Sequence, residues 1–251
     1  AYLTVPEIGL AVLADGLGGH LAGEVASGIA VDIIRRNLIG ALAEDGEVAD
    51  AAHADGASRE ARSIKSAIEL ANSAIHEAST TRAECAGMGA TVVATVLYDD
   101  KICIAHVGDS RVYRLRDAKL EQVTEDHSMI QELVRRGFLT AEEARTSVNK
   151  NVVTRALGVE AHVQVEVHEH DVIDGDIYLL CSDGLSDVLP QQAIEQILTE
   201  RQTDFYDALH AMVERVNAAG GPDNVSIILV RAGAKFARSK QAIQHLQQLF
   251  N

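Results

Sequence analysis

The sequence predicts a single α+β domain in which two packed β-sheets are covered by outer helices. Two amphipathic helical patterns follow one another in the first third of the chain, and strand patterns then arrive together rather than alternating with helices. No internal repeat, low-complexity run or linker divides the sequence. With 251 residues, 47% of them apolar, the chain is long enough to bury a substantial core.

A buried strand and two long helices open the chain. The apolar run 8–14 has the length and composition of a buried strand. Apolar side chains spaced 4, 3 and 4 then predict a helix that begins near Leu21 and fades by Ala43. The same spacing predicts a second helix around residues 64–75. Between the helices, the acidic, glycine-punctuated segment 44–60 is expected to be an exposed loop.

Strand patterns come next. The stretch 90–100 is almost wholly apolar and rich in β-branched residues, and its closing Asp-Asp pair indicates a tight turn into a strand at 101–109. A further strand begins at Arg111 and turns at Asp117–Ala118 into a short partner. We therefore expect consecutive hairpins with antiparallel pairing.

The second half of the chain mixes short helices with further strands. Ser128 and Gln131 form a capping box that opens a helix, which Gly137 ends. Thr140 and Glu143 repeat the capping box for a shorter helix. Weak periodicity over residues 145–158 indicates an irregular flap. The remaining predicted elements are strands at 163–167, 176–181 and 225–231 and helices at 190–200 and 205–216.

Charge and composition exclude several classes of protein. A net charge of −15 argues against a nucleic-acid partner, because binding phosphates needs a basic surface. No apolar run approaches the roughly 20 residues that span a bilayer, and no signal peptide is visible, so we expect a soluble, cytoplasmic protein without membrane contact. The three cysteines show no C-x-x-C spacing, and Cys103 and Cys181 lie in apolar strand patterns, which predicts reduced core thiols.

Aspartates mark four places where an apolar run meets small or polar residues: Asp15 in ADGLGGH, Asp109 in HVGDSR, Asp183 in CSDGLSD and Asp223 in GGPDNVS. Singly, each could be a turn residue, and Asp109 could instead form an ion pair with Arg111. Their common setting predicts one convergent site that binds a cation. Oxygen ligands without a His or Cys cluster select hard ions such as Mg²⁺ or Mn²⁺.

Such a site suits phosphoryl chemistry. Two ions about 3.5–4 Å apart can clamp a phosphoryl group and activate a water to attack it. His20 is the best-placed candidate to protonate the leaving alkoxide, although a loop histidine could simply be solvated. A covalent aspartyl intermediate is not expected, because none of the four aspartates lies in an Asp-x-Asp motif. A phosphate-binding P-loop is also not expected, since no Lys-Ser/Thr follows the glycines near Thr91.

Seven segments in order resemble the motifs of one enzyme family: VLADGLGGHLAGEVAS, GMGATVVATVL, AHVGDSRVYRL, LEQVTEDHS, NVVTRALG, LLCSDGLSD and GPDNVSIILV. They are similar to the motif series of the metal-dependent PPM/PP2C protein serine/threonine phosphatases, and the DGLGGH form is most similar to the small bacterial members. The resemblance spans residues 11–231. It implies an α-β-β-α sandwich of two antiparallel sheets, flanked by antiparallel helices, with a binuclear Mn²⁺ or Mg²⁺ centre between the sheets.

The resemblance also implies roles for single residues. Asp15 would bridge two metal ions, and Gly16 would contribute its backbone carbonyl. Asp183 and Asp223 would be the acidic ligands of the other metal, and Asp109 would serve a third, weaker one. The catalytic assignments are then Asp15 and His20.

The implied function is hydrolysis of phosphoserine and phosphothreonine on proteins. We expect phosphorylated proteins as partners and an action that opposes a serine/threonine kinase. We also expect a monomer with no nucleic-acid or membrane partner. The alternative is a catalytically weak phosphatase-like module that only binds phosphoprotein partners. The phosphatase domain is expected at 1–232, followed by a helical tail at 233–251. The family's opening motif, an arginine followed by Asn-Glu-Asp, does not precede Ala11. We expect it upstream of the printed sequence, and the alternative is that this copy has lost it.

Overall fold

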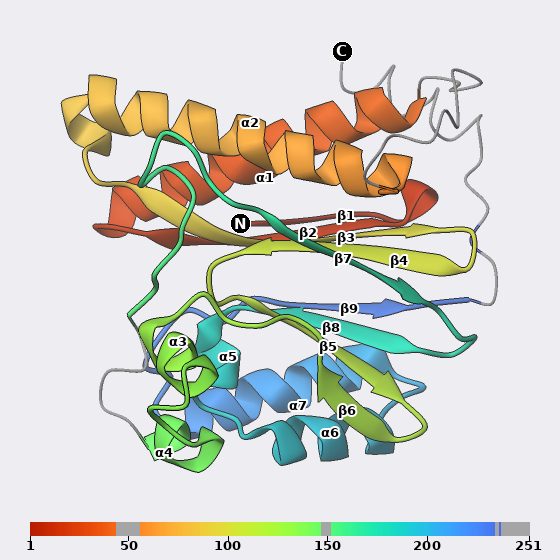
Figure 1. The fold of residues 1–251 in the computed structure, drawn as a ribbon. Helices are drawn as coiled ribbons and strands as arrows, with labels where there is room; N and C mark the ends of the chain where they lie inside the picture. Colours follow the sequence, from red (N-terminus) through yellow and green to blue (C-terminus); the bar gives the residue numbers. More distant parts are fainter. Residues whose placement is uncertain (44–55, 147–151, 234–235, 237–251) are drawn as a thin grey trace.

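Two antiparallel β-sheets stack face to face between two layers of helices (Figure 1). In the computed structural model, residues 1–43, 56–146, 152–233 and 236 are described. The architecture confirms the predicted α+β class and the α-β-β-α sandwich.

The first sheet has five strands in the order β1-β2-β3-β4-β7. Their bounds are Tyr2–Val5, Leu10–Leu17, Gly89–Tyr98, Lys101–Val107 and Glu166–Asp171. Helices α1 (His20–Ala43) and α2 (Arg59–Thr81) cover its outer face (Figure 1). Short 3₁₀ turns at Pro6–Ile8 and Ala83–Cys85 lead into β2 and β3.

The second sheet has four strands in the order β6-β5-β8-β9. Their bounds are Lys119–Gln122, Arg111–Arg116, Ile177–Cys181 and Ile227–Arg231. Helices α6 (Gln191–Glu200) and α7 (Phe205–Ala218) cover its outer face, and the short helix α5 (Asp183–Ser186) follows β8 directly. Helices α3 (Met129–Arg135) and α4 (Ala141–Thr146) lie beside one end of the sandwich (Figure 1).

Strand β2 shows why its sequence is a continuous apolar run. Leu10, Val12 and Ala14 belong to the core under α1 and α2. Ala11 and Leu13 belong to the core between the two sheets. Because side chains alternate across a strand, a strand that is covered on both faces must be apolar at every position.

The capping box predicted at Thr140 is complete, whereas at Ser128 only the N-cap hydrogen bond is present, and the Gln131 side chain donates to Glu125 instead. The Ser128 hydroxyl accepts a hydrogen bond from the Gln131 N–H at 3.2 Å, at the start of α3. At α4, the Thr140 hydroxyl accepts from the Glu143 N–H, and the Glu143 carboxylate accepts from the Thr140 N–H at 2.8 Å. Each cap satisfies an amide donor that the first turn of a helix leaves unpaired.

The expectation of consecutive hairpins is correct for two pairs and wrong for their connection. Strands β3 and β4 form one hairpin and β5 and β6 form another, with positive φ at Asp99, Asp117 and Ala118 in the turns. Between β4 and β5, however, the chain crosses from one sheet to the other at residues 108–110. Local apolar patterns show that a strand exists but not which sheet it joins.

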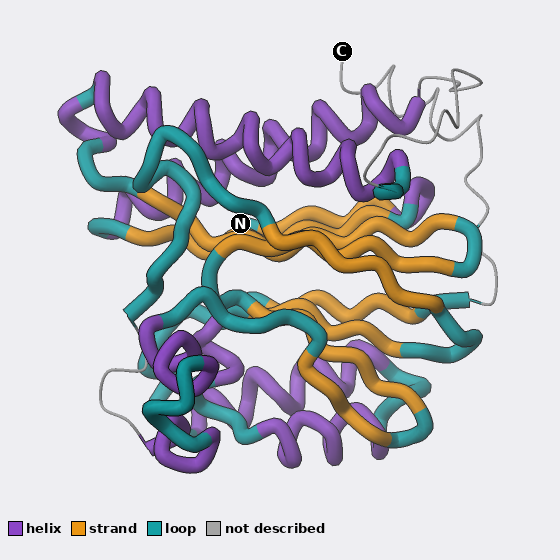
Figure 2. Tube along the Cα trace, viewed as in Figure 1, coloured by secondary structure: helices purple, strands orange, loops and turns teal. Residues whose placement is uncertain are grey.

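The strand predicted at 163–167 begins later, at Glu166. Its partner β4 ends at Val107, and His106 pairs with Glu166, so the residues before Glu166 have no neighbouring strand. Val163, Val165 and Val167 still face the core under the two long helices, which explains their alternation. The connection 152–165 passes over α2 on its way to β7 (Figure 2), where Asn72 accepts from the Gly158 N–H at 2.8 Å.

Some expectations fall on residues outside the described ranges. Most of the loop 44–60 does so, and the second helix begins at Arg59 after an N-cap hydrogen bond to Ser58. The helical tail 233–251 also lies outside them, apart from Gly233 and Phe236, and the domain division at 232 stays a prediction. The cysteines are free and buried, as expected, and burial raises the pKa of Cys103 and of Cys181 to about 12.

Candidate metal centre

Three of the predicted aspartates lie at or next to the ends of strands, one in the first sheet and two in the second. Asp15 lies near the end of β2, in the first sheet. Asp183 is the first residue of α5, directly after β8 in the second sheet. Asp223 lies in the turn that precedes β9, the neighbour of β8. The site therefore forms only when the two sheets stack.

Glycines allow the backbones at this site to approach closely. A Cβ on Gly16 would lie 2.0 Å from the carbonyl oxygen of Gly23, so these two glycines let α1 pack against the end of β2. A Cβ on Gly184 would lie 2.1 Å from the carbonyl oxygen of Asn224. The turn that carries Asp223 can thus sit against the start of α5.

Hydrogen bonds hold that turn in place. The Ser182 N–H donates to the Ser226 carbonyl, and the Ser226 N–H donates to the Ser182 hydroxyl, both at 3.1 Å. The Ser182 hydroxyl lies 3.4 Å from the Asn224 carbonyl. Ser182 precedes Asp183, so one residue links the two aspartate-bearing segments.

The carboxylates are close enough to perturb one another. Burial, followed by repulsion from Asp109, Asp15 and Asp223, raises the pKa of Asp183 to about 7. Burial and the charge of Asp223 also raise the pKa of Asp15. Without a cation, this group of like charges is costly to ionise, which is the electrostatic setting that a bound divalent ion relieves.

The donor atoms fit a hard cation. Oδ1 of Asp183 is buried and accepts no hydrogen bond from any described residue. A buried acceptor without a donor is expected where an ion binds. The side chains that meet at this point offer only carboxylate oxygens, which suit Mg²⁺ or Mn²⁺. Asp15, Asp183 and Asp223 are the residues that would hold such an ion.

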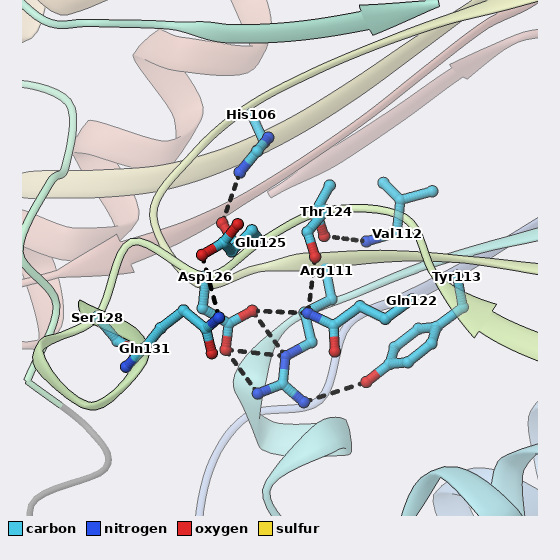
Figure 3. A network of polar contacts seen from close by, with 10 residues as sticks. All are labelled: His106, Arg111, Val112, Tyr113, Gln122, Thr124, Glu125, Asp126, Ser128 and Gln131. Atoms are coloured by element: carbon cyan, nitrogen blue, oxygen red, sulfur yellow. Dashed lines mark hydrogen bonds and ion pairs between the residues drawn. The ribbon is translucent and has the colours of Figure 1, made fainter. Parts of the chain in front are cut away.

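Asp109 reaches the same centre from the crossing between the sheets. It is 9% exposed, and burial followed by the charge of Asp126 raises its pKa to about 6. The alternative ion pair between Asp109 and Arg111 is not what the structure shows. Arg111 instead binds Asp126, through Nε at 2.9 Å and Nη2 at 2.6 Å (Figure 3).

The Arg111–Asp126 pair is part of a polar network beside a cavity. Arg111 also donates to the Tyr113 hydroxyl at 3.1 Å, and Gln122 donates to Asp126 at 3.0 Å (Figure 3). The cavity has a volume of about 580 Å³ and borders both Asp109 and Asp183. It lies between the second sheet and α3, so a group bound at the aspartates has open space beside it.

For two of the predicted site residues, Gly16 and His20, the structure gives the position in the chain fold but does not test the role. Gly16 lies in β2 next to Asp15, and the role of its carbonyl as a ligand stays a prediction. His20 is the first residue of α1, but its side chain lies outside what the structure describes. Its role as a proton donor therefore also stays a prediction.

Sequence reasoning from the residues alone missed Asp126 and His127. Both lie in the LEQVTEDHS segment, which entered only through the family resemblance. The contacts that tie them to the site are made with distant residues: Asp126 binds Arg111, 15 positions away, and His127 binds Gly108, 19 positions away. No periodicity or spacing signals such contacts.

Fold and site together define a class of protein: a four-layer α-β-β-α sandwich with a carboxylate centre for hard divalent cations at one end. None of the described helices combines the length and hydropathy needed to cross a bilayer.

Comparisons with known proteins agree with this class. The family described as protein phosphatase 2C matches residues 4–229. The serine/threonine phosphatase stp of Listeria monocytogenes is 36% identical over 221 residues, which cover 88% of this chain and 83% of that protein. The chain therefore belongs to the protein phosphatase 2C family, as its motifs predicted.

Solved structures support the same assignment. The crystal structure of the Mycobacterium tuberculosis serine/threonine phosphatase PstP/Ppp is similar, with a TM-score of 0.78 and 32% identity over 93% of this chain and 91% of that chain. The catalytic domain of PstP in complex with two manganese ions has a TM-score of 0.72 and 32% identity, covering 91% of this chain and 89% of that chain.

Proposed function

We propose that this chain is a metal-dependent protein serine/threonine phosphatase that hydrolyses phosphoserine and phosphothreonine. The observation that carries the proposal is the meeting of Asp15, Asp183 and Asp223 from two stacked sheets, with a buried carboxylate oxygen that lacks a donor among the described residues. The similar PstP catalytic domain was solved with two manganese ions, and family membership makes the same cofactor, Mn²⁺ or Mg²⁺, the expectation here.

Each residue of the centre has a proposed task. Asp15, Asp183 and Asp223 would hold two divalent ions, with the Gly16 carbonyl as a further ligand, and Asp109 would serve a third, weaker ion. When bound, such ions polarise the phosphoryl group and lower the pKa of a water that attacks phosphorus. His20 would donate the proton that the leaving serine or threonine oxygen needs.

The cavity beside the aspartates has room for part of a protein substrate. It borders Asp109 and Asp183, so residues that flank the phosphorylated side chain can lie in it. Arg111 lines the cavity, but its guanidinium is held by Asp126 and Tyr113. We assign Arg111 to shaping the cavity wall rather than to gripping phosphate.

The physiological setting belongs to the same proposal. The relatives named serine/threonine phosphatases come from bacteria. We propose that this chain acts as a cytoplasmic monomer on phosphorylated proteins and opposes a serine/threonine kinase. The net charge of −15 supports a partner other than nucleic acid.

Phosphate release tests the proposal. The whole chain is assayed on a phosphothreonine peptide with Mn²⁺ and with EDTA. We expect Mn²⁺-dependent release that falls by about 100-fold or more in Asp15→Asn and Asp183→Asn, the size of effect seen when electrostatic stabilisation is removed. Asp174→Asn is the matched control, because Asp174 is an exposed aspartate before the start of β8, away from the strand ends that carry the site.

Absence of turnover with Mn²⁺ present, on a correctly folded chain, would contradict the proposal. If that protein still bound the phosphopeptide in calorimetry, the phosphatase-like binding module would be the better description.

A further inference from the structure

Gly108 has both of its backbone polar groups bound by one residue, His127. The Gly108 N–H donates to Nδ1 of His127 at 3.0 Å, and the His127 N–H donates to the Gly108 carbonyl at 2.9 Å. Gly108 has φ +106 and lies at the crossing between the two sheets, directly before Asp109. The direction in which the chain enters Asp109 is therefore held largely by His127.

The second ring nitrogen of His127 faces the edge strand β7. Nε2 lies 3.0 Å from Oε1 of Glu166. Because Nδ1 accepts a hydrogen bond from Gly108, the neutral ring carries its proton on Nε2 and donates it to Glu166. Burial, followed by the nearby His106 and Arg155, lowers the pKa of His127 to about 4, which agrees with a neutral ring.

A metal site is the competing interpretation of these side chains. His106, His127 and Glu166 offer ligand atoms within 4.8 Å of one another, and Nδ1 of His106 is buried without a partner among the described residues. A metal on Nε2 of His127 would need a lone pair there, which would move the proton to Nδ1, against the Gly108 N–H. The Arg155 guanidinium also lies 3.0 Å from Nε2 and would repel a cation. The hydrogen bonds favour a fixed neutral imidazole over a metal ligand.

Neighbouring groups fix the ring of His127. The ring of His106 stacks on it, with 4.6 Å between centroids, and His106 Nε2 lies 2.9 Å from the Glu125 carbonyl. Arg155 donates to Glu166 Oε1 and to the Gln164 carbonyl, both at 3.2 Å. The ring is therefore held on its face and at Nε2, and it presents Nδ1 to Gly108 in one orientation.

The backbone of His127 also joins this turn to the base of the α3–α4 segment. The Thr154 N–H donates to the His127 carbonyl at 2.8 Å, and the Met129 N–H donates to the Val152 carbonyl at 2.9 Å. His127 thus contacts both the Gly108 turn and, through its carbonyl, Thr154 in the connection that leads to β7.

We propose that His127 is a positioning residue for Asp109: through the backbone of Gly108 it directs the Asp109 carboxylate into the metal-binding group of aspartates. The inference rests on the proposed function, since it assigns Asp109 to that group. Loss of the Nδ1 contact weakens binding of the ion that Asp109 serves, while Asp15, Asp183 and Asp223, which hold the other ions, stay in place.

Two substitutions separate the two nitrogens. In His127→Asn, the amide oxygen lies near the position of Nδ1 and can still accept from Gly108. In His127→Gln, the amide lies near the position of Nε2 and can still donate to Glu166, but the Gly108 contact is lost. We expect His127→Gln to raise the Mn²⁺ concentration needed for half-maximal phosphatase activity by about 10-fold or more, the size seen when a group that orients a metal ligand is removed. His127→Asn should stay within about threefold of the unchanged chain.

Three readouts distinguish positioning from a general loss of stability. At saturating Mn²⁺ the kcat of His127→Gln should return to near the original value. In an Asp109→Asn background, His127→Gln should have no further effect on Mn²⁺ dependence, because both changes act through the same carboxylate. In EDTA, amide hydrogen exchange at Gly108 should stay slow in His127→Asn and become fast in His127→Gln.

Equal effects of the Asn and Gln variants, or an undiminished effect of His127→Gln in the Asp109→Asn background, would overturn the inference. So would movement of the ring ¹⁵N resonances of both His106 and His127 on titration with Zn²⁺, which would identify a metal site. If the unchanged chain released no phosphate, the proposed function would fail, whereas Gly108 exchange and Mn²⁺ calorimetry would still decide the role of His127.

Discussion

At the scale of single residues, the carboxyl groups of the centre destabilise the metal-free fold when they ionise. Asp183 is buried beside other aspartates, and its pKa is raised to about 7. An unfolded aspartate titrates near pKa 3.9, so the folded chain retains a proton that the unfolded chain has already released. Stability in the absence of metal therefore falls as the pH rises from about 4 to about 7.

The fall in metal-free stability with rising pH gives a prediction for Asp183→Asn in EDTA. Asn cannot ionise, so the variant escapes the loss, and its Tm relative to the unchanged chain should rise between pH 5 and pH 8. One pKa unit corresponds to about 1.4 kcal/mol, and about 2–4 °C accompany each kcal/mol in a domain of this size. A relative gain of more than about 3 °C is expected by scanning calorimetry.

The matched control is Asp174→Asn, whose Tm should follow that of the unchanged chain across the same pH range. In Mn²⁺ the order should reverse, because the ion stabilises the unchanged chain but not the variant. A Tm difference for Asp183→Asn that does not vary with pH in EDTA would mean that Asp183 is not held among like charges.

A second prediction at this scale concerns His20. If His20 protonates the leaving oxygen, His20→Ala should slow hydrolysis of a phosphothreonine peptide by about 10²–10⁴-fold. It should have little effect on p-nitrophenyl phosphate, whose leaving group departs without a proton. Steady-state kcat on both substrates checks this, and equal losses on the two would assign His20 to another task.

At the scale of elements, close backbone contacts bring the strand ends together. The start of α5 meets the turn before β9 at Gly184, where a Cβ would lie 2.1 Å from the Asn224 carbonyl. Gly184→Ala should destabilise the chain by about 1–3 kcal/mol, because backbone must move to relieve the overlap. The same movement shifts Asp223 away from Asp183, so Mn²⁺ affinity measured by calorimetry should fall as well.

Gly28→Ala provides the control for that substitution. Gly28 is an exposed residue inside α1, and its added Cβ would contact nothing within 4 Å. Alanine should stabilise the helix by up to about 1 kcal/mol and leave Mn²⁺ affinity unchanged. Equal behaviour of the two variants in urea unfolding would show that the contact at Gly184 is unimportant.

Elements were predictable where the signal is local. The N-caps at Ser128 and Thr140 and the turns at Asp99 and Asp117 depend on residues within a few positions of one another. The start of β7 was not predictable in this way, because it is set by where the partner strand β4 ends. The edge strand β1 also went unpredicted, since only four residues form it.

At the scale of the whole molecule, the site is a product of sheet stacking. The four aspartates share a local setting, so their convergence could be predicted from sequence, and the motif order supplied the family. The crossing at Gly108 and the hydrogen bonds between Gly108 and His127 could not be predicted. They depend on a ring nitrogen meeting a backbone N–H 19 residues away, which leaves no pattern in the sequence.

The central claim is that Asp15, Asp183 and Asp223 hold divalent ions where the two sheets meet. Anomalous scattering from crystals of the whole chain grown with Mn²⁺ tests it most directly. We expect two strong manganese peaks, with carboxylate oxygens of these aspartates at coordination distance. Peaks located only elsewhere, for example between His106, His127 and Glu166, or no peak beside Asp15, would contradict the account.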